Sequence, residues 1–101
     1  IDKREAIADW NLTAKQLVAK IKGLNPSPGV WFIHKSSRIR IISAIETNYN
    51  GNPGEVLDDE LTIACKENSL KISSLQKEGK KKLTSKDFLI GYKIKKGEKL
   101  S

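Results

Sequence analysis

The sequence predicts a small, mainly β domain, either an antiparallel barrel or a rolled sheet, with a helix before the strands and a short helix after them. Two observations predict this class. Five short runs of β-branched or alternating apolar residues are separated by clusters of turn-forming residues. A segment with helix-end signals flanks these runs on each side. At 101 residues, the chain is one domain with room for a single modest core.

The first helix is predicted from its start signals. Thr13 is placed as the N-cap, with Gln16 as the answering residue of a capping box, and Leu12 and Leu17 have hydrophobic-staple spacing. The apolar stripe of this helix consists of Leu17, Val18, Ile21 and Leu24. Gly23 is expected to be its C-cap.

The strands are predicted after the turn NPSPGV, whose prolines cannot continue a helix. The expected strands are VWFIH, RIRII, the short segment at residues 55–57, LTIAC and LKISSL. HKSS is expected to be a hairpin tip, with Ile39 and Ile41 on one strand face and Arg38 and Arg40 on the other. The second helix is expected to begin near Thr84 and to end at Gly91.

The positive charge is concentrated at one end of the chain. Residues 1–75 contain ten basic and nine acidic residues, whereas residues 76–101 contain nine basic and three acidic ones. This asymmetry favours a polyanionic partner, and a lysine-rich solvated tail is the alternative. The basic side chains assigned to phosphate contacts are Lys77, Lys80, Lys81, Lys82, Lys86, Lys93, Lys95 and Lys96 near the C-terminus, and Arg38 and Arg40 on a strand.

The other reactive side chains are interpreted as structural. His34 has no catalytic partner nearby in the sequence and is expected to be a surface or half-buried side chain. Cys65 is assigned to the core. The acidic residues 58–60 are expected to form a solvated turn, so no metal site is predicted. Trp10 and Trp31 are assigned to core packing. No apolar run is long enough to span a bilayer, and we expect a soluble, cytoplasmic monomer without a membrane partner.

Four motifs follow one another in a distinctive order: AIADWNLTAKQL, IKGLNPSPGVWF, NPGEVL and LQKEGKKKLTSKDFLIG. Together they resemble the C-terminal domain of methionyl-tRNA formyltransferase over about residues 5–91. The resemblance implies an oligonucleotide-binding-like barrel that follows an N-terminal catalytic domain. That family transfers a formyl group from 10-formyltetrahydrofolate to methionine on initiator tRNA. Its catalytic residues and donor site belong to the N-terminal domain, so no catalytic residue or cofactor site is expected here.

The resemblance also implies how the chain is divided and what it contacts. Residues 1–9 correspond to the end of an interdomain linker, and their Lys3 and Arg4 are also assigned to nucleic-acid binding. Residues 10–91 correspond to the barrel domain, and residues 92–101 to a basic and partly loose tail. By position, Gly79 and the three following lysines carry over to the tRNA-facing side. Ser27 and Lys77 depart from the family pattern, which usually has a bulky aromatic residue and often a proline there.

Two other functions remain open at this stage. One is a structural barrel in a related formyltransferase that acts on a sugar nucleotide, because fold alone does not decide function. The other is a free-standing nucleic-acid-binding module, which would need aromatic residues exposed on the barrel face.

Overall fold

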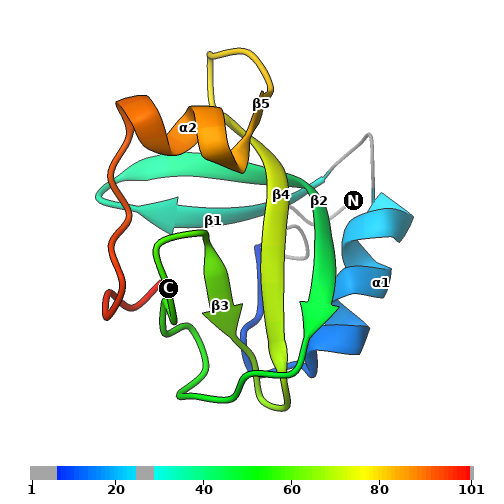
Figure 1. Ribbon diagram of the computed structural model, residues 1–101. Helices are drawn as coiled ribbons and strands as arrows, with labels where there is room; N and C mark the ends of the chain where they lie inside the picture. Colours follow the sequence, from blue (N-terminus) through cyan, green and yellow to red (C-terminus); the bar gives the residue numbers. More distant parts are fainter. Residues whose placement is uncertain (1–6, 25–28, 101) are drawn as a thin grey trace.

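The computed structural model describes residues 7–24 and 29–100 (Figure 1). The expectations for Lys3, Arg4, Ser27 and the prolines of the turn fall outside the described residues. The elements in chain order are α1 (Ala14–Leu24), β1 (Val30–His34), β2 (Ser37–Thr47), β3 (Thr62–Ala64), β4 (Ser69–Lys77), β5 (Leu83–Thr84) and α2 (Ser85–Gly91).

The strands form one antiparallel sheet in the order β1-β2-β4-β3, with β5 also paired to β4. The first half of the long strand β2 pairs with both β1 and β4, and its second half continues along β4. The register shifts between Ile41 and Ala44, and such a bulge bends a strand and increases its twist. In Figure 1, α1 lies beside β2, and α2 lies near β5. The predicted class, a mainly β antiparallel domain with an N-terminal and a short C-terminal helix, is confirmed.

The hairpin tip between β1 and β2 lies where the sequence placed it. His34 pairs with Ser37, which leaves a two-residue loop of Lys35 and Ser36. Both loop residues have positive φ, 47° and 70°. This is the conformation that matches the right-handed twist of two antiparallel strands.

The N-terminus of α1 confirms the predicted capping box. The Gln16 backbone N–H donates to Thr13 Oγ1 at 3.1 Å, and the Thr13 N–H donates to Gln16 Oε1 at 3.0 Å. The prediction of Gly23 as C-cap is wrong, because α1 continues to Leu24. The Leu24 carbonyl accepts a hydrogen bond from the Gly29 N–H at 2.8 Å, so a residue beyond the turn satisfies this helix end.

The predicted strand at residues 55–57 is not a strand of the sheet. Val56 makes a single bridge to Ile63, and Glu55 makes one to Lys99. The fifth strand is instead the two-residue β5, which follows the run of three lysines. Turn residues stand immediately before Glu55 and after Leu57, which leaves no room for a longer ladder.

The C-terminal residues are part of the packed domain up to residue 100, so the expectation of a loose tail is wrong there. Ile94 and Leu100 are buried between exposed lysines. The Leu100 N–H donates to the Gly54 carbonyl at 2.7 Å, and the Val56 N–H donates to the Glu98 carbonyl at 2.8 Å. Burial of these two apolar side chains stabilises the packing of this lysine-rich segment against the rest of the domain.

The N-terminal residues 7 and 8 also belong to the domain, although the sequence assigned them to a linker. Ile7 bridges Trp31 in parallel, the Ala8 N–H donates to the Trp31 carbonyl at 2.7 Å, and Ala8 is buried. The domain therefore includes residues 7 and 8, which lie beside β1, whereas the linker was expected to extend to residue 9.

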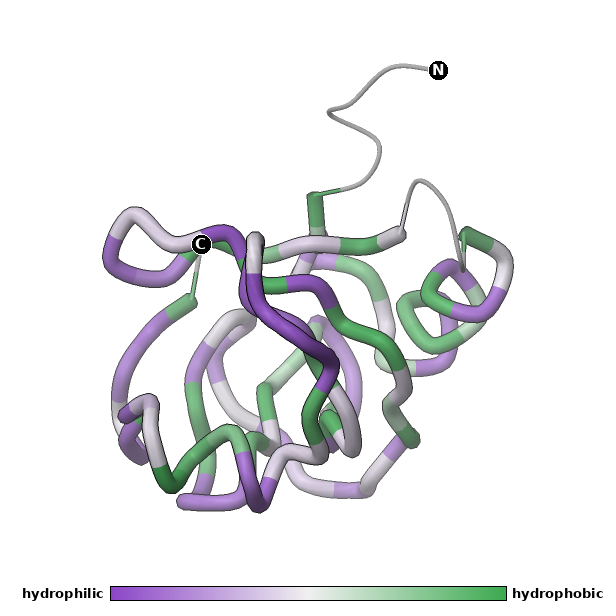
Figure 2. The backbone as a smooth tube through the Cα atoms, turned by 90° about the horizontal axis from the view of Figure 1, so that it is seen from above, coloured by the Kyte–Doolittle hydropathy of each residue, from purple (hydrophilic) through white to green (hydrophobic). Residues whose placement is uncertain are grey.

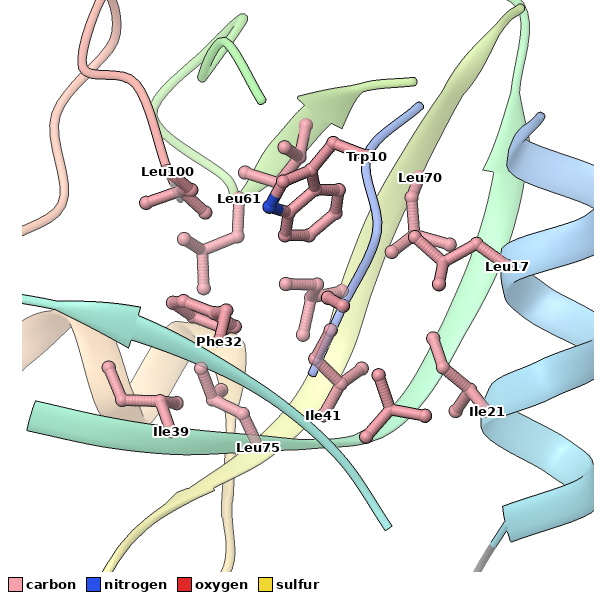
Figure 3. Packing of buried hydrophobic residues seen from close by; sticks show 14 of the residues in the cluster. Trp10, Leu17, Ile21, Phe32, Ile39, Ile41, Leu61, Leu70, Leu75 and Leu100 are labelled. Atoms are coloured by element: carbon pink, nitrogen blue, oxygen red, sulfur yellow. The ribbon is translucent and has the colours of Figure 1, made fainter. Parts of the chain in front are cut away.

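The core is enclosed by the curved strands, with Leu17 and Ile21 entering from α1 on one side and Leu100 from the C-terminal segment on another (Figure 3). It also contains Trp10, Phe32, Ile39, Ile41, Leu61, Leu70 and Leu75. Trp10 is 5% exposed, and its ring meets Phe32 edge-on with centroids 6.3 Å apart. Its assignment to the core is confirmed, as is that of Cys65. The assignment of Trp31 to the core is wrong, because Trp31 is only half-buried and lies on the outer sheet face.

Figure 2 shows hydrophobic and hydrophilic residues interspersed along the chain. In α1, the buried residues are Ala14, Leu17 and Ile21. None of the helices within the described residues is both long and apolar enough to cross a bilayer.

Candidate nucleic-acid interface

The lysine loop, defined here as residues 78–82, connects β4 to β5 and is held at several points. The Glu78 N–H donates to the Arg38 carbonyl at 2.9 Å, and the Lys80 N–H donates to the Lys77 carbonyl at 2.9 Å. Gln76 Nε2 donates to the Lys80 carbonyl at 2.8 Å. Gly79 supplies the positive φ of 81° that closes the turn. These bonds fix the backbone that presents the lysines.

Lys80, Lys81 and Lys82 are all exposed. The carboxylates of the described residues pair with His34, Arg38 and Lys71, and none pairs with these three lysines. Three ammonium groups on a fixed loop therefore face solvent without an ion-pair partner among the described residues. Exposed ammonium groups of this kind are suited to contact phosphates.

The two strand arginines lie on the outer face of the sheet next to this loop. Arg38 pairs across the hairpin with Ile33, and Arg40 pairs with Trp31 and, on its other side, with Gln76. The Arg38 guanidinium carbon is 4.5 Å from the Trp31 ring centroid, and its Nη1 is 3.5 Å from Glu78. Arg38 is thus already engaged by an aromatic ring and a carboxylate.

Arg40 packs against Gly29, the residue before β1. A Cβ added at Gly29 would lie 2.5 Å from Arg40 Nε, so this glycine is needed for the close approach of the arginine side chain. The side chain remains half-exposed. Both arginines lie on one strand face, as predicted, and both also make contacts within the protein.

The remaining predicted lysines lie in a second group, which surrounds Asp59. One shallow hollow is lined by Asp59, Leu89, Lys93, Ile94, Lys95 and Lys96. A neighbouring hollow contains Asp59, Glu60, Lys71 and Lys86. The Lys96 N–H also donates to Asp59 Oδ1 at 3.4 Å. Asp59 and Glu60 therefore stand among the lysines of this group.

Lys77 connects the lysine loop to an apolar hollow that the sequence analysis did not predict. Its Nζ lies 5.3 Å from the Tyr92 ring centroid. The hollow has a volume of about 340 Å³ and is lined by Lys77, Lys80, Lys81, Leu83, Asp87, Phe88, Gly91 and Tyr92. The i, i+4 spacing of Phe88 and Tyr92 was the available sequence signal, but Tyr92 had been assigned to the tail.

His34 has partners that are distant in the sequence. It is 5% exposed, with Nδ1 2.8 Å from the Tyr92 hydroxyl and Nε2 2.8 Å from Glu98 Oε1. The Tyr92 hydroxyl also donates to the His34 carbonyl at 3.1 Å. These bonds join the β1–β2 hairpin to the C-terminal segment. The prediction of a surface or half-buried side chain is therefore wrong, because residues 58 and 64 positions later enclose the ring.

The acidic turn at residues 58–60 is ordered by its own hydrogen bonds. Asp58 accepts from the Glu60 and Thr62 backbone N–H groups and from Thr62 Oγ1. Burial opposes its charge, but these bonds and the charge of Lys71 outweigh that effect and lower the pKa of Asp58. Across the part of the chain that the structure describes, no cluster of three histidine, cysteine, aspartate or glutamate residues could hold a metal ion.

Two further groups have shifted pKa values. Hydrogen bonds from the Lys95 backbone N–H and from the His34 side chain lower the pKa of Glu98. Burial, with a smaller effect from the negative charge of Glu46, raises the pKa of the Cys65 thiol to about 11. This cysteine is a core residue rather than a nucleophile at neutral pH.

The fold and this surface define a small antiparallel β domain with a basic loop. The family model for the formyl transferase C-terminal domain matches residues 1–93. The chain belongs to this family.

Curated relatives agree with this assignment. The chain is 42% identical to the methionyl-tRNA formyltransferase of Bradyrhizobium diazoefficiens, over all of this chain and 34% of that protein. It is 43% identical to the methionyl-tRNA formyltransferase of Paramagnetospirillum magneticum, over 94% of this chain and 31% of that protein. The chain thus spans about a third of the length of these relatives.

A solved structure shares the fold. HypX from Aquifex aeolicus, crystallised in complex with tetrahydrofolic acid, superposes with a TM-score of 0.71 and 22% sequence identity. The match covers 88% of this chain and 17% of HypX.

Proposed function

We propose that this chain is the tRNA-holding domain of a methionyl-tRNA formyltransferase. The observation that supports the proposal most is the lysine loop, where three exposed lysines stand on a fixed backbone and form no ion pair with any described residue. The names of the curated relatives supply the substrate class. On this proposal, the loop contacts phosphates of initiator tRNA and reads its folded shape rather than its base sequence.

The chemistry is proposed to occur outside this chain. The N-terminal catalytic domain of the same protein would bind 10-formyltetrahydrofolate and transfer the formyl group. Our chain would contribute by holding the tRNA so that the aminoacyl end reaches that domain, which is a positioning role. The 101-residue chain alone is then expected to bind RNA in the cytoplasm, as a monomer, without catalysing transfer.

The test compares two charge-matched triple substitutions. The first changes Lys80, Lys81 and Lys82 to Ala, and the second changes Lys93, Lys95 and Lys96 to Ala. Affinity for initiator tRNA is measured across a salt series by fluorescence anisotropy. Each lost phosphate contact lowers the slope of log K against log salt by about 0.7–0.9, so the first variant should lose up to about 2–3 units of slope.

The control variant removes the same charge from the group around Asp59 and should keep most of the slope. If both variants lose the same slope, only net charge matters and the loop has no special role. If the first variant binds as the unchanged chain does, the lysines are merely solvated and the domain acts as a structural barrel.

A further inference from the structure

We propose that the apolar hollow beside the lysine loop binds one unpaired nucleotide, with the base against Leu83, Phe88 and Tyr92 and the phosphate at Lys80 and Lys81. This inference deepens the proposed function and rests on it, because the phosphate end of the hollow is the lysine loop itself. It adds a contact of a different kind, made to a base rather than to the RNA backbone.

The hollow combines two surfaces that phosphate binding alone does not require. One end is formed by the lysines of β4 and the loop, and the other by apolar side chains of β5, α2 and the residue after α2. A purely electrostatic grip on phosphates needs no apolar floor. A nucleotide carries an anionic group and a flat, largely apolar ring separated by one sugar, and it is therefore complementary to both ends.

The walls of the hollow are held in place before any ligand arrives. Thr84 Oγ1 accepts from the Asp87 N–H at 3.2 Å and caps α2. The Tyr92 ring lies 5.0 Å from that of Phe88, and its hydroxyl is bonded to His34. On the opposite side, Gln76 holds the Lys80 carbonyl. A volume of about 340 Å³ lies at the lower end of the range for preformed ligand sites.

Asp87 makes the two ends of the hollow different in charge. Its side chain is exposed on the rim and makes no hydrogen bond or ion pair with any described residue. A carboxylate accepts hydrogen bonds and repels phosphate, so the phosphate belongs at the lysine end. Asp87 is then placed to accept from a base amino group, as adenine, cytosine and guanine offer. Bases paired within an RNA helix are not free to enter such a hollow, which favours an unpaired nucleotide.

The first experiment tests the base contact directly. Amide shifts of the 101-residue chain are recorded by NMR with millimolar adenosine 5′-monophosphate, and separately with ribose 5-phosphate. We expect the nucleotide to shift the amides of Leu83, Phe88, Gly91 and Tyr92, and ribose 5-phosphate to shift only the lysine loop. Equal shifts with both compounds, or none near Phe88 with either, would overturn the inference.

The second experiment fills the hollow with a side chain of the protein. Gly91 lines the hollow, is exposed, and has open space where a Cβ would be placed. The Gly91→Leu substitution should weaken binding of the tRNA about tenfold, within the range measured for loss of one base contact, and leave the salt slope unchanged. Gly23→Leu is the matched control, because Gly23 is also an exposed helical glycine with open space around it.

The results separate this inference from the proposed function. If the lysine substitutions flatten the salt slope while Gly91→Leu binds like Gly23→Leu, the loop holds phosphates and the nucleotide site is refuted. If adenosine 5′-monophosphate shifts the hollow while the lysine substitutions leave tRNA binding unchanged, the nucleotide site stands and the tRNA-holding role fails. Thermal unfolding of each variant by circular dichroism establishes that it is folded.

Discussion

Replacing Gly54 by Ala tests how the C-terminal segment is attached to the domain. Gly54 has a φ of 90°, and a Cβ there would lie 2.6 Å from the Leu100 backbone oxygen. The same two residues are joined by the hydrogen bond from the Leu100 N–H to the Gly54 carbonyl. An alanine must therefore displace the segment that it holds.

The expected magnitude has two parts. The left-handed backbone costs an alanine about 1–2 kcal/mol. The steric conflict also displaces Leu100, which is 2% exposed. Loss of this burial costs about 1.5–3 kcal/mol, the value of burying one leucine side chain. We expect Gly54→Ala to lower the free energy of unfolding by about 2.5–5 kcal/mol.

Gly97→Ala is the control for the backbone part. Gly97 has a φ of 93° but nothing within 4 Å of its Cβ position, so it should lose only about 1–2 kcal/mol. Urea unfolding followed by tryptophan fluorescence measures both variants, since Trp10 lies 3.5 Å from the Gly54 Cβ position. Equal losses in the two variants would refute the reasoning, because the conflict with Leu100 would then have no cost.

Two further predictions concern pH and reactivity. The folded pKa values of Asp58 and Glu98 lie below their ordinary values of 3.8 and 4.5, so their stabilisation is complete above pH 4.5 and is lost as pH falls through the folded values. Urea unfolding between pH 3 and 7 should show this loss, and the double variant Asp58→Asn with Glu98→Gln should show a weaker pH dependence. Cys65, with its thiol pKa raised to about 11, should react with a thiol reagent at pH 8 only after unfolding; rapid labelling of the folded chain would contradict its place in the core.

Local signals in the sequence predicted the elements that are determined by neighbouring residues. The capping box of Thr13 and Gln16, the hairpin tip and the start of the second helix near Thr84 lie where they were predicted. Each depends on hydrogen bonds or backbone angles within about four residues, and such interactions are encoded locally.

Tertiary contacts decided what the local pattern could not. The C-terminal residues read as a basic tail because lysines dominate their composition, but Leu100 meets Gly54 and Tyr92 meets His34 across the fold. The segment at residues 55–57 has the composition of a strand, yet within the described residues it makes only single bridges, from Glu55 to Lys99 and from Val56 to Ile63.

For the candidate site, the sequence by itself determined the cluster of positive charge and the glycine that turns the chain within it. It could not determine which basic residues lie together, because exposed lysines leave no periodic pattern that predicts their neighbours. The fold places Lys77, Lys80 and Lys81 beside Tyr92, while Lys93, Lys95 and Lys96 lie with Asp59. The physical reason is that α2 packs against β4 and β5 through Phe88, and burial of that ring fixes which lysines face the hollow.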